Sequence, residues 1–391
     1  MTFEERLVVV VVASAAAFLG FVFATVSPVL PLIVEHFQSS ANGDIVAQWL
    51  LTMPSVGIAI GGPASGWVVG RFGARPVLLV CLILFALIGL SSFVIENTIL
   101  LLAARLAVGI IAAGQATASS IVLGETFVGT RRGSVIGFQI ALASVAGVAA
   151  FLAAGILGEW GGWRAPSALY AVALPVALLA ALVVPRSDAR RSQSRSEPGA
   201  FRAIVVVLAL TAVTMMISFI SASQVPLLLS EHGISRPSIV SAVLGGTTIA
   251  TTIGALLYNR IRVRVGARRT NAIGGALQAL GLLFLGASTG LGPIAFGALT
   301  LALGSGVLTP GFSHAIMERS SEAARARAIG MLLTAQFAGP FLCTALILPI
   351  IESFGRVTTL LWLGMLLFTA WSVVSIRAQG PLRVDIGSTQ P

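Results

Sequence analysis

Long, nearly uninterrupted apolar runs follow one another along the whole chain, and they limit its possible folds more than any other feature. A membrane-spanning helix needs about 20 consecutive, mostly apolar residues. Twelve runs of that kind cover approximately residues 7–34, 45–70, 76–95, 99–123, 133–158, 164–185, 203–229, 237–258, 270–289, 291–315, 327–352 and 357–377. A β-barrel would instead alternate in polarity over segments of about 10 residues. We therefore expect an all-α integral membrane protein with twelve transmembrane helices.

Composition excludes several classes of protein. Apolar residues make up 57% of the 391 residues and charged residues only 10%, against about 45–50% and 25% in soluble domains; the mean hydropathy is +0.98. A disordered chain, a disulfide scaffold and an ordinary cytosolic enzyme are thereby disfavoured. The three histidines are scattered, and we find no metal-ligand spacing and no nucleotide loop. We predict no catalytic residues, no metal, no cofactor and no enzyme activity.

All basic residues are arginines, and their placement predicts topology. Of the 24 arginines, 20 fall at the termini and in the gaps after even-numbered runs, three fall in the other gaps, and Arg105 lies inside a run. Cytoplasmic loops are enriched in basic residues, so both termini are expected in the cytoplasm. Arginines dispersed over short gaps do not form one soluble basic face, so we expect no nucleic-acid partner. The absence of lysine favours a bacterial source, and hence a multi-pass protein of the bacterial cytoplasmic (inner) membrane.

The two halves of the chain repeat each other. A shift of 193 residues carries Arg71, Gly73 and Arg75 onto Arg264, Gly266 and Arg268. The same shift carries Glu125 onto Glu318. Parallel repeats are typical of transporters whose substrate site lies near mid-membrane between the halves. We predict a six-helix bundle over 1–185, a Ser/Arg-rich cytoplasmic linker over 186–202, a second bundle over 203–377 and a cytoplasmic tail over 378–391.

Three motifs resemble those of a known family. The loop Gly66–Arg75 and the Arg105-x-x-x-Gly109 pattern resemble the loop and buried-arginine motifs of the major facilitator superfamily, and Gly162-Trp-Arg, followed by Pro166 and Tyr170, resembles its twelve-span drug and sugar (arabinose-efflux-like) exporters. The resemblance covers nearly the full chain and implies the major-facilitator fold, with two pseudo-symmetric six-helix bundles, and a monomer that works by alternating access.

The chain departs from the family pattern in ways that bear on gating. Gly70 stands where the loop motif carries an acid, which in the family is thought to latch the halves. No Asp or Glu lies within a run, and the proline that usually follows glycine in the exporters' fifth span is absent. We expect the gating and coupling residues to be Arg105, Arg71, Arg75, Glu125, Arg264, Arg268, His314 and Glu318.

Arg105 and His314 each allow two interpretations. A charge within the bilayer is costly, which makes a functional role the default; Arg105 then binds an anionic substrate, gates, or perturbs a proton carrier. The alternative is a structural arginine bonded to carbonyls and hydroxyls of neighbouring helices. Histidine titrates near neutral pH, which suits a coupling group, but His314 is also spaced to pair with Glu318 one helical turn away.

Uncharged polar residues within the runs define a candidate cavity. The predicted substrate-binding residues are Arg105, Gln115, Gln139, Gln224, Thr248, Thr252 and Gln336. With Phe18, Phe21, Met215, Met216 and Phe219 they predict a mostly apolar cavity with a few polar groups. Each hydroxyl has an alternative role in helix packing.

We predict a secondary-active exporter of small amphiphilic molecules, with proton antiport as the candidate coupling. Its expected partners are a small-molecule substrate, the lipid bilayer and protons. A facilitator or uptake permease for a small polar or anionic metabolite remains the alternative. An arginine without a carboxylate favours neutral or anionic substrates over permanent cations.

Overall fold

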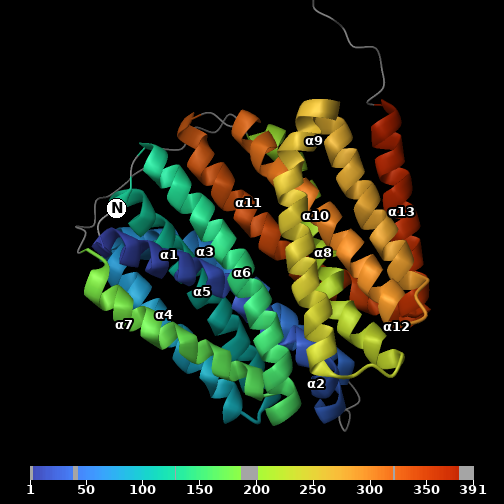
Figure 1. Ribbon diagram of the computed structural model, residues 1–391, viewed down its shortest axis with the longest axis horizontal. Coiled ribbons are helices and arrows are strands. Elements are labelled where there is room, and N and C mark those ends of the chain that lie inside the picture. Colours follow the sequence, from blue (N-terminus) through green and yellow to red (C-terminus); the bar gives the residue numbers. More distant parts are fainter. Residues whose placement is uncertain (1–2, 38–42, 128, 186–200, 320–321, 378–391) are drawn as a thin grey trace, which may run out of the picture.

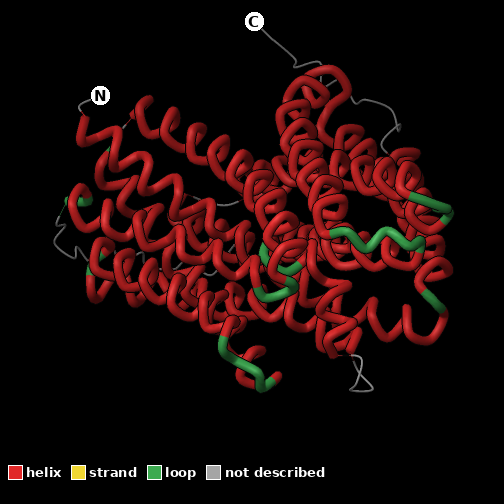
Figure 2. The backbone as a smooth tube through the Cα atoms, turned by 60° about the horizontal axis from the view of Figure 1, so that its bottom comes forward, coloured by secondary structure: helices red, strands yellow, loops and turns green. Residues whose placement is uncertain are grey.

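The computed structural model describes residues 3–37, 43–127, 129–185, 201–319 and 322–377. Every regular element in these ranges is helical, and loops occupy only the ends of the helices (Figure 2). The predicted linker, apart from residues 201 and 202, and the predicted tail lie outside the described residues.

The chain forms two bundles, which we call the N half and the C half. The N half comprises α1 (Phe3–Ala24), η1 (Ser27–Val29), α2 (Leu30–Phe37), α3 (Gly43–Phe72), α4 (Ala74–Leu90), η2 (Ser91–Phe93), α5 (Thr98–Thr126), α6 (Gly129–Gly161), η3 (Ala165–Val172) and α7 (Ala173–Val183). The C half comprises α8 (Phe201–Glu231), α9 (Pro237–Gly286), α10 (Leu291–Arg319), α11 (Glu322–Leu342), η4 (Cys343–Ile347), α12 (Leu348–Phe354) and α13 (Arg356–Arg377). Figure 1 shows the two halves tilted against each other.

The helices confirm the expected fold. Within the described ranges, ten helical stretches are long and apolar enough to cross a membrane. One of them, α9, consists of two helices that meet at the non-helical Gly266, and α13 completes the C half. With these two additions, the described residues contain the predicted twelve transmembrane helices in two pseudo-symmetric bundles.

One predicted boundary is wrong. We expected the arginine-rich stretch 259–269 to be a gap between runs, whereas α9 stays helical through it except at Gly266. Arginine is a good helix former, so charge alone did not end the helix. Gly266 has φ 82° and ψ 161°, and Gly73, its partner in the repeat, has φ 89° and ψ 156°. Both glycines supply a positive φ that other residues rarely adopt.

The repeat also sets how the helices cross. A Cβ atom on Gly109 of α5 would lie 2.0 Å from the carbonyl oxygen of Pro54 on α3. In the C half, a Cβ on Gly306 of α10 would lie 2.0 Å from the carbonyl oxygen of Thr251 on α9. Small residues let membrane helices approach closely, and Gly57 of α3 makes another such contact, with the Leu106 carbonyl oxygen of α5.

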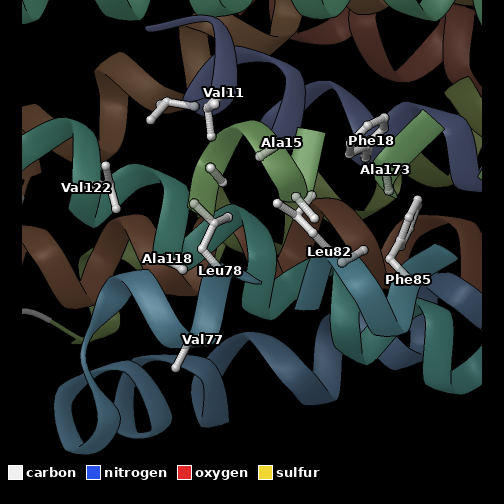
Figure 3. Packing of buried hydrophobic residues seen from close by; sticks show 14 of the residues in the cluster. Val11, Ala15, Phe18, Val77, Leu78, Leu82, Phe85, Ala118, Val122 and Ala173 are labelled. Carbon is white, nitrogen blue, oxygen red and sulfur yellow. The ribbon is translucent and has the colours of Figure 1, made fainter. Parts of the chain in front are cut away.

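The N half has its own apolar core. Phe18 of α1, Leu82 and Phe85 of α4, Ala118 of α5 and Ala173 of α7 point into it (Figure 3). Phe18 and Phe85 stack with ring centroids 5.5 Å apart. Phe18 thus packs inside one bundle and does not line the cavity between bundles.

A second core joins the two halves at one end of the molecule. We call this end the gate face; it holds η1, the start of α3 and residues 232–236. The shared core contains Val29 and Ile33 from the N half and Ile220 and Leu228 from the C half, all at most 2% exposed. The opposite end, which we call the terminal face, holds Phe3, the start of α6, Gly266 and Arg377.

Candidate functional site

A cavity of about 410 Å³ lies between the halves. It is bounded by α1 and α6 of the N half and by α8, α9, α10 and α11 of the C half. Its lining residues are Phe23, Phe151, Met215, Ser218, Phe219, Ser221, Ala222, Leu244, Thr247, Thr251, Ala302, Ser305, Thr309, Gln336, Phe337 and Pro340. Ligand pockets typically enclose about 300–1,000 Å³ and are largely apolar with a few polar groups, so this cavity suits a small molecule.

The polar groups of the cavity are all uncharged. The Ser218 hydroxyl donates to the Ser305 hydroxyl at 2.7 Å, and the Nε2 of Gln278, behind them, donates to Ser305 at 2.8 Å and to Ser218 at 3.1 Å. The buried Ser221 hydroxyl has no hydrogen-bond partner among the described residues. Gln336 contributes the only amide side chain of the lining. These groups can hydrogen-bond to a neutral ligand, and none of them neutralises a charge.

Of the seven predicted substrate-binding residues, Gln336 lines this cavity. Gln115 donates through Nε2 to the carbonyl oxygen of Ala15 at 2.8 Å, and Gln139 donates to that of Val12 at 3.5 Å. Both glutamines therefore fasten their helices to the α1 backbone. A backbone carbonyl can accept the hydrogen bond of a glutamine amide just as a substrate can. The residue type alone therefore does not distinguish a glutamine that binds substrate from one that joins two helices.

The two predicted threonines lie on α9 beside α6. Thr252 donates to the Ser144 hydroxyl of the other half at 3.2 Å and to the Thr248 carbonyl at 2.9 Å. Thr248 donates to the Leu244 carbonyl at 3.4 Å. The neighbouring Thr247 and Thr251 line the cavity, so the threonines of this helix face both the cavity and the opposite half.

Arg105 is buried inside the N half. Its Nη1 donates to the Tyr170 hydroxyl at 2.8 Å and to the Thr25 hydroxyl at 3.4 Å. The side chain is 5% exposed, and Nε has no hydrogen-bond partner among the described residues. Arg105 is not among the residues that line the cavity, and its partners match the hydroxyls of the structural interpretation.

The predicted gating residues other than Arg105 lie toward the terminal face, away from the cavity lining. Four of them have exposed side chains: Arg71, Glu125, Arg264 and Arg268. Arg75 donates to the Ala181 carbonyl of its own half at 2.6 Å. His314 is half-buried near the end of α10, and the side chain of Glu318, its expected ion-pair partner, lies outside the described residues.

The gate face carries a polar chain that crosses between the halves. Gln224 of α8 donates through Nε2 to the Gln48 Oε1 of α3 at 3.2 Å and accepts from the Arg356 Nη1 of α13 at 3.0 Å. Arg356 pairs in turn with Glu231, with Nε and Oε1 3.1 Å apart. Gln224, a predicted substrate-binding residue, thus lies among gate contacts. Nearby, the Ser27 hydroxyl donates to the Ala222 carbonyl across the same boundary.

Sequence reasoning missed Arg356. In the sequence it stands out only as one of three arginines in the gaps opposite the arginine-rich side. The repeat held a usable signal, because Gly162 and Gly355, separated by the 193-residue shift, both have positive φ, at 70° and 81°. Each is followed closely by an arginine, Arg164 or Arg356.

Comparison with known proteins identifies the family. The model described as Major Facilitator Superfamily matches residues 12–235, and that described as Sugar (and other) transporter matches residues 189–376. The chain is 30% identical over 177 residues to the arabinose-proton symporter of Escherichia coli (strain K12), and 24% identical over 152 residues to the galactose-proton symporter of the same strain. These matches cover 44% and 39% of this chain and only 36% and 32% of the symporters.

Solved structures share the fold. A D-xylose-proton symporter has a TM-score of 0.78 at 16% identity, covering 95% of this chain and 97% of the symporter. An inward-open xylose transporter from E. coli has a TM-score of 0.72 at 16% identity, covering 94% and 95%. Since the first family model spans more than half of the chain, this multi-pass membrane protein belongs to the Major Facilitator Superfamily of secondary transporters.

Proposed function

We propose that this chain moves a small, uncharged amphiphilic molecule across the membrane by alternating access through the cavity between its halves. The observation that carries the proposal is the lining of that cavity, which combines phenylalanines with hydroxyls and one amide and includes no ionisable side chain. The sequence left both neutral and anionic substrates open, and the anionic option loses its main support because Arg105 is bonded within the N half. A neutral substrate fits the lining best.

We propose export as the direction, with both termini in the cytoplasm and the terminal face therefore cytoplasmic. The apolar character of the lining favours amphiphiles that partition from the bilayer. On this arrangement the gate face is extracytoplasmic, and the shared core closes that side. The protein works as a monomer in a bacterial cytoplasmic membrane, with protons as the coupling ion and His314, Glu318 and Arg105 as candidates for the coupling residues.

Uptake of a sugar by proton symport is the second candidate. It is favoured by the partial similarity to an arabinose-proton and a galactose-proton symporter. The cavity hydroxyls and Gln336 can hydrogen-bond to sugar hydroxyls. Both candidates share a neutral substrate and differ in direction and in the sign of proton coupling.

Counterflow in proteoliposomes tests the substrate class. Vesicles are loaded with one unlabelled compound and exchanged against its labelled form, across a panel of pentoses, hexoses, neutral lipophilic compounds, organic acids and quaternary ammonium ions. We expect exchange of a neutral compound. Saturable exchange of a permanent cation, with none of any neutral compound, would overturn the proposal.

A proton gradient then determines direction. For the compound that exchanges, proton antiport predicts accumulation on the acidic side of the membrane, because substrate moves against the proton flow. Proton symport predicts accumulation on the alkaline side. Proteolysis of an epitope added to the C-terminus fixes how many molecules face each way in the vesicles. Transport that ignores the proton gradient would remove proton coupling from the proposal.

A further inference from the structure

Arg356 occupies an unusual place for a charged residue. It begins α13 at the gate face, yet its side chain is only 12% exposed. Withdrawing a charge from water is costly unless hydrogen bonds and an opposite charge compensate. Arg356 obtains both from α8, through the Gln224 amide oxygen at 3.0 Å and the Glu231 carboxylate at 3.1 Å.

The compensation extends into the other half. The Gln224 side chain is 1% exposed and that of Gln48 is 2% exposed, so neither amide has water as a ready alternative partner. Gln224 uses its oxygen for Arg356 and its nitrogen for Gln48 of α3. Asp44, also on α3, attracts Arg356 electrostatically. The hydrogen bonds Gln48–Gln224 and Gln224–Arg356, together with the Arg356–Glu231 ion pair, therefore tie the N half to a buried cation of the C half.

The matching loop of the N half carries an arginine one position out of register, Arg164, and it is bonded differently. Arg164 donates to the carbonyl oxygens of Phe93 and Ile95, at 3.2 Å each, and both belong to its own half. Arg164 and Arg356 both follow glycines with a positive φ at equivalent positions. Of these two arginines, only Arg356 is linked to the other half by hydrogen bonds among the described residues, through Gln224 to Gln48. This asymmetry separates a bridging role from the ordinary anchoring of a loop.

We propose that Arg356, acting through Gln224 on Gln48, is a latch that keeps the gate face closed. Opening this face separates α3 from α8, which breaks the Gln48–Gln224 hydrogen bond and admits water to Arg356. Glu231 is a positioning residue, because it fixes the guanidinium within its own half. The proposal rests on the alternating-access function above and names the residues that set the balance between its two states.

The test reads gate opening directly, without substrate. Ser27 is 0% exposed, and its hydroxyl contacts the opposite half at the gate, so the cysteine introduced by Ser27→Cys should react with a water-soluble maleimide only when the gate opens. The native thiols are removed by Cys81→Ala and Cys343→Ala. The rate of modification is measured on purified protein in lipid nanodiscs.

We expect Arg356→Gln, which removes a charge-assisted hydrogen bond, and Gln48→Leu, which removes the cross-boundary acceptor of the buried Gln224 amide, each to raise the modification rate about tenfold or more. Combining the two should add little, because both break one chain of bonds. Arg164→Gln removes the same charge from the matched loop and should change the rate by less than about twofold. Size-exclusion profiles and apparent Tm values identify any variant that fails to fold; Gln48→Leu, which leaves every charge in place, then carries the test.

Unchanged rates in Arg356→Gln and Gln48→Leu would overturn the latch, as would an equal rise in Arg164→Gln. The outcome is independent of substrate identity. A faster rate in the latch variants, with no neutral compound exchanged in counterflow, would uphold the latch and reject the proposed substrate class. Counterflow of a neutral compound, with unchanged labelling in the latch variants, would uphold the proposed substrate class and reject the latch.

Discussion

The crossing of α3 and α5 leaves no space for a side chain at Gly109, which makes Gly109→Ala a severe test of the packing. The new Cβ would lie 2.0 Å from the Pro54 carbonyl oxygen and 2.7 Å from its carbonyl carbon. Real Cβ contacts essentially never fall below 3.0 Å, so the helices must separate by about 1 Å. The atoms in the way are backbone, and no rotamer change removes them.

Overpacking of this kind costs about 1–3 kcal/mol. For a unit of 150–250 residues, about the size of one half, each kcal/mol shifts Tm by about 2–4 °C. We therefore expect the apparent Tm of Gly109→Ala to fall by about 2–12 °C. Thermal unfolding of purified protein in one detergent, followed by intrinsic fluorescence, measures the shift.

Two further variants serve as comparisons for Gly109→Ala, one with an equivalent close contact and one without. Gly306→Ala meets the equivalent contact in the C half, with 2.0 Å to the Thr251 carbonyl oxygen, and should lower Tm similarly. Gly62→Ala lies on α3 with nothing within 4 Å, so replacing a helical glycine should leave Tm unchanged or raise it slightly. Equal effects of Gly109→Ala and Gly62→Ala would refute the close crossing.

Three other substitutions have defined outcomes. Tyr170→Phe removes the hydroxyl that accepts from Arg105 at 2.8 Å and should lower the free energy of unfolding by about 1.5–3 kcal/mol; no change in chemical denaturation would contradict the bond. Gly155→Ala places a Cβ 2.1 Å from a serine hydroxyl of the C half, so it should speed maleimide labelling at the gate, and an unchanged rate would count against that contact. Gln278→Leu deletes the donor to Ser305 and Ser218 and should lower the free energy of unfolding by about 1–3 kcal/mol. A denaturation curve identical to that of the parent would contradict this expectation.

The fold could be predicted because lipid imposes simple rules on long apolar runs. The 193-residue repeat even located the equivalent glycines Gly73 and Gly266, and in the structure both have a positive φ. The boundary at 259–269 failed because arginine density indicated a loop, whereas arginine is compatible with a helix.

The candidate site was less predictable, because composition does not say which way a polar side chain faces. Gln115 and Gln336 both lie in apolar runs, yet one bonds to the α1 backbone and the other lines the cavity. The link from Arg356 to Gln48 joins residues 308 positions apart in sequence through Gln224. Such pairing depends on the approach of two bundles, which no local pattern in the sequence describes.

Blocking the cavity tests the central claim that substrate passes between the halves. Gln336→Trp places a bulky ring in the lining, while Leu333→Trp puts the same ring on the same helix at a position that is 51% exposed and outside the lining. With the compound identified by counterflow, we predict that Gln336→Trp reduces exchange to the level of protein-free vesicles and that Leu333→Trp exchanges like the parent. Full exchange by a folded Gln336→Trp protein would contradict a path through this cavity.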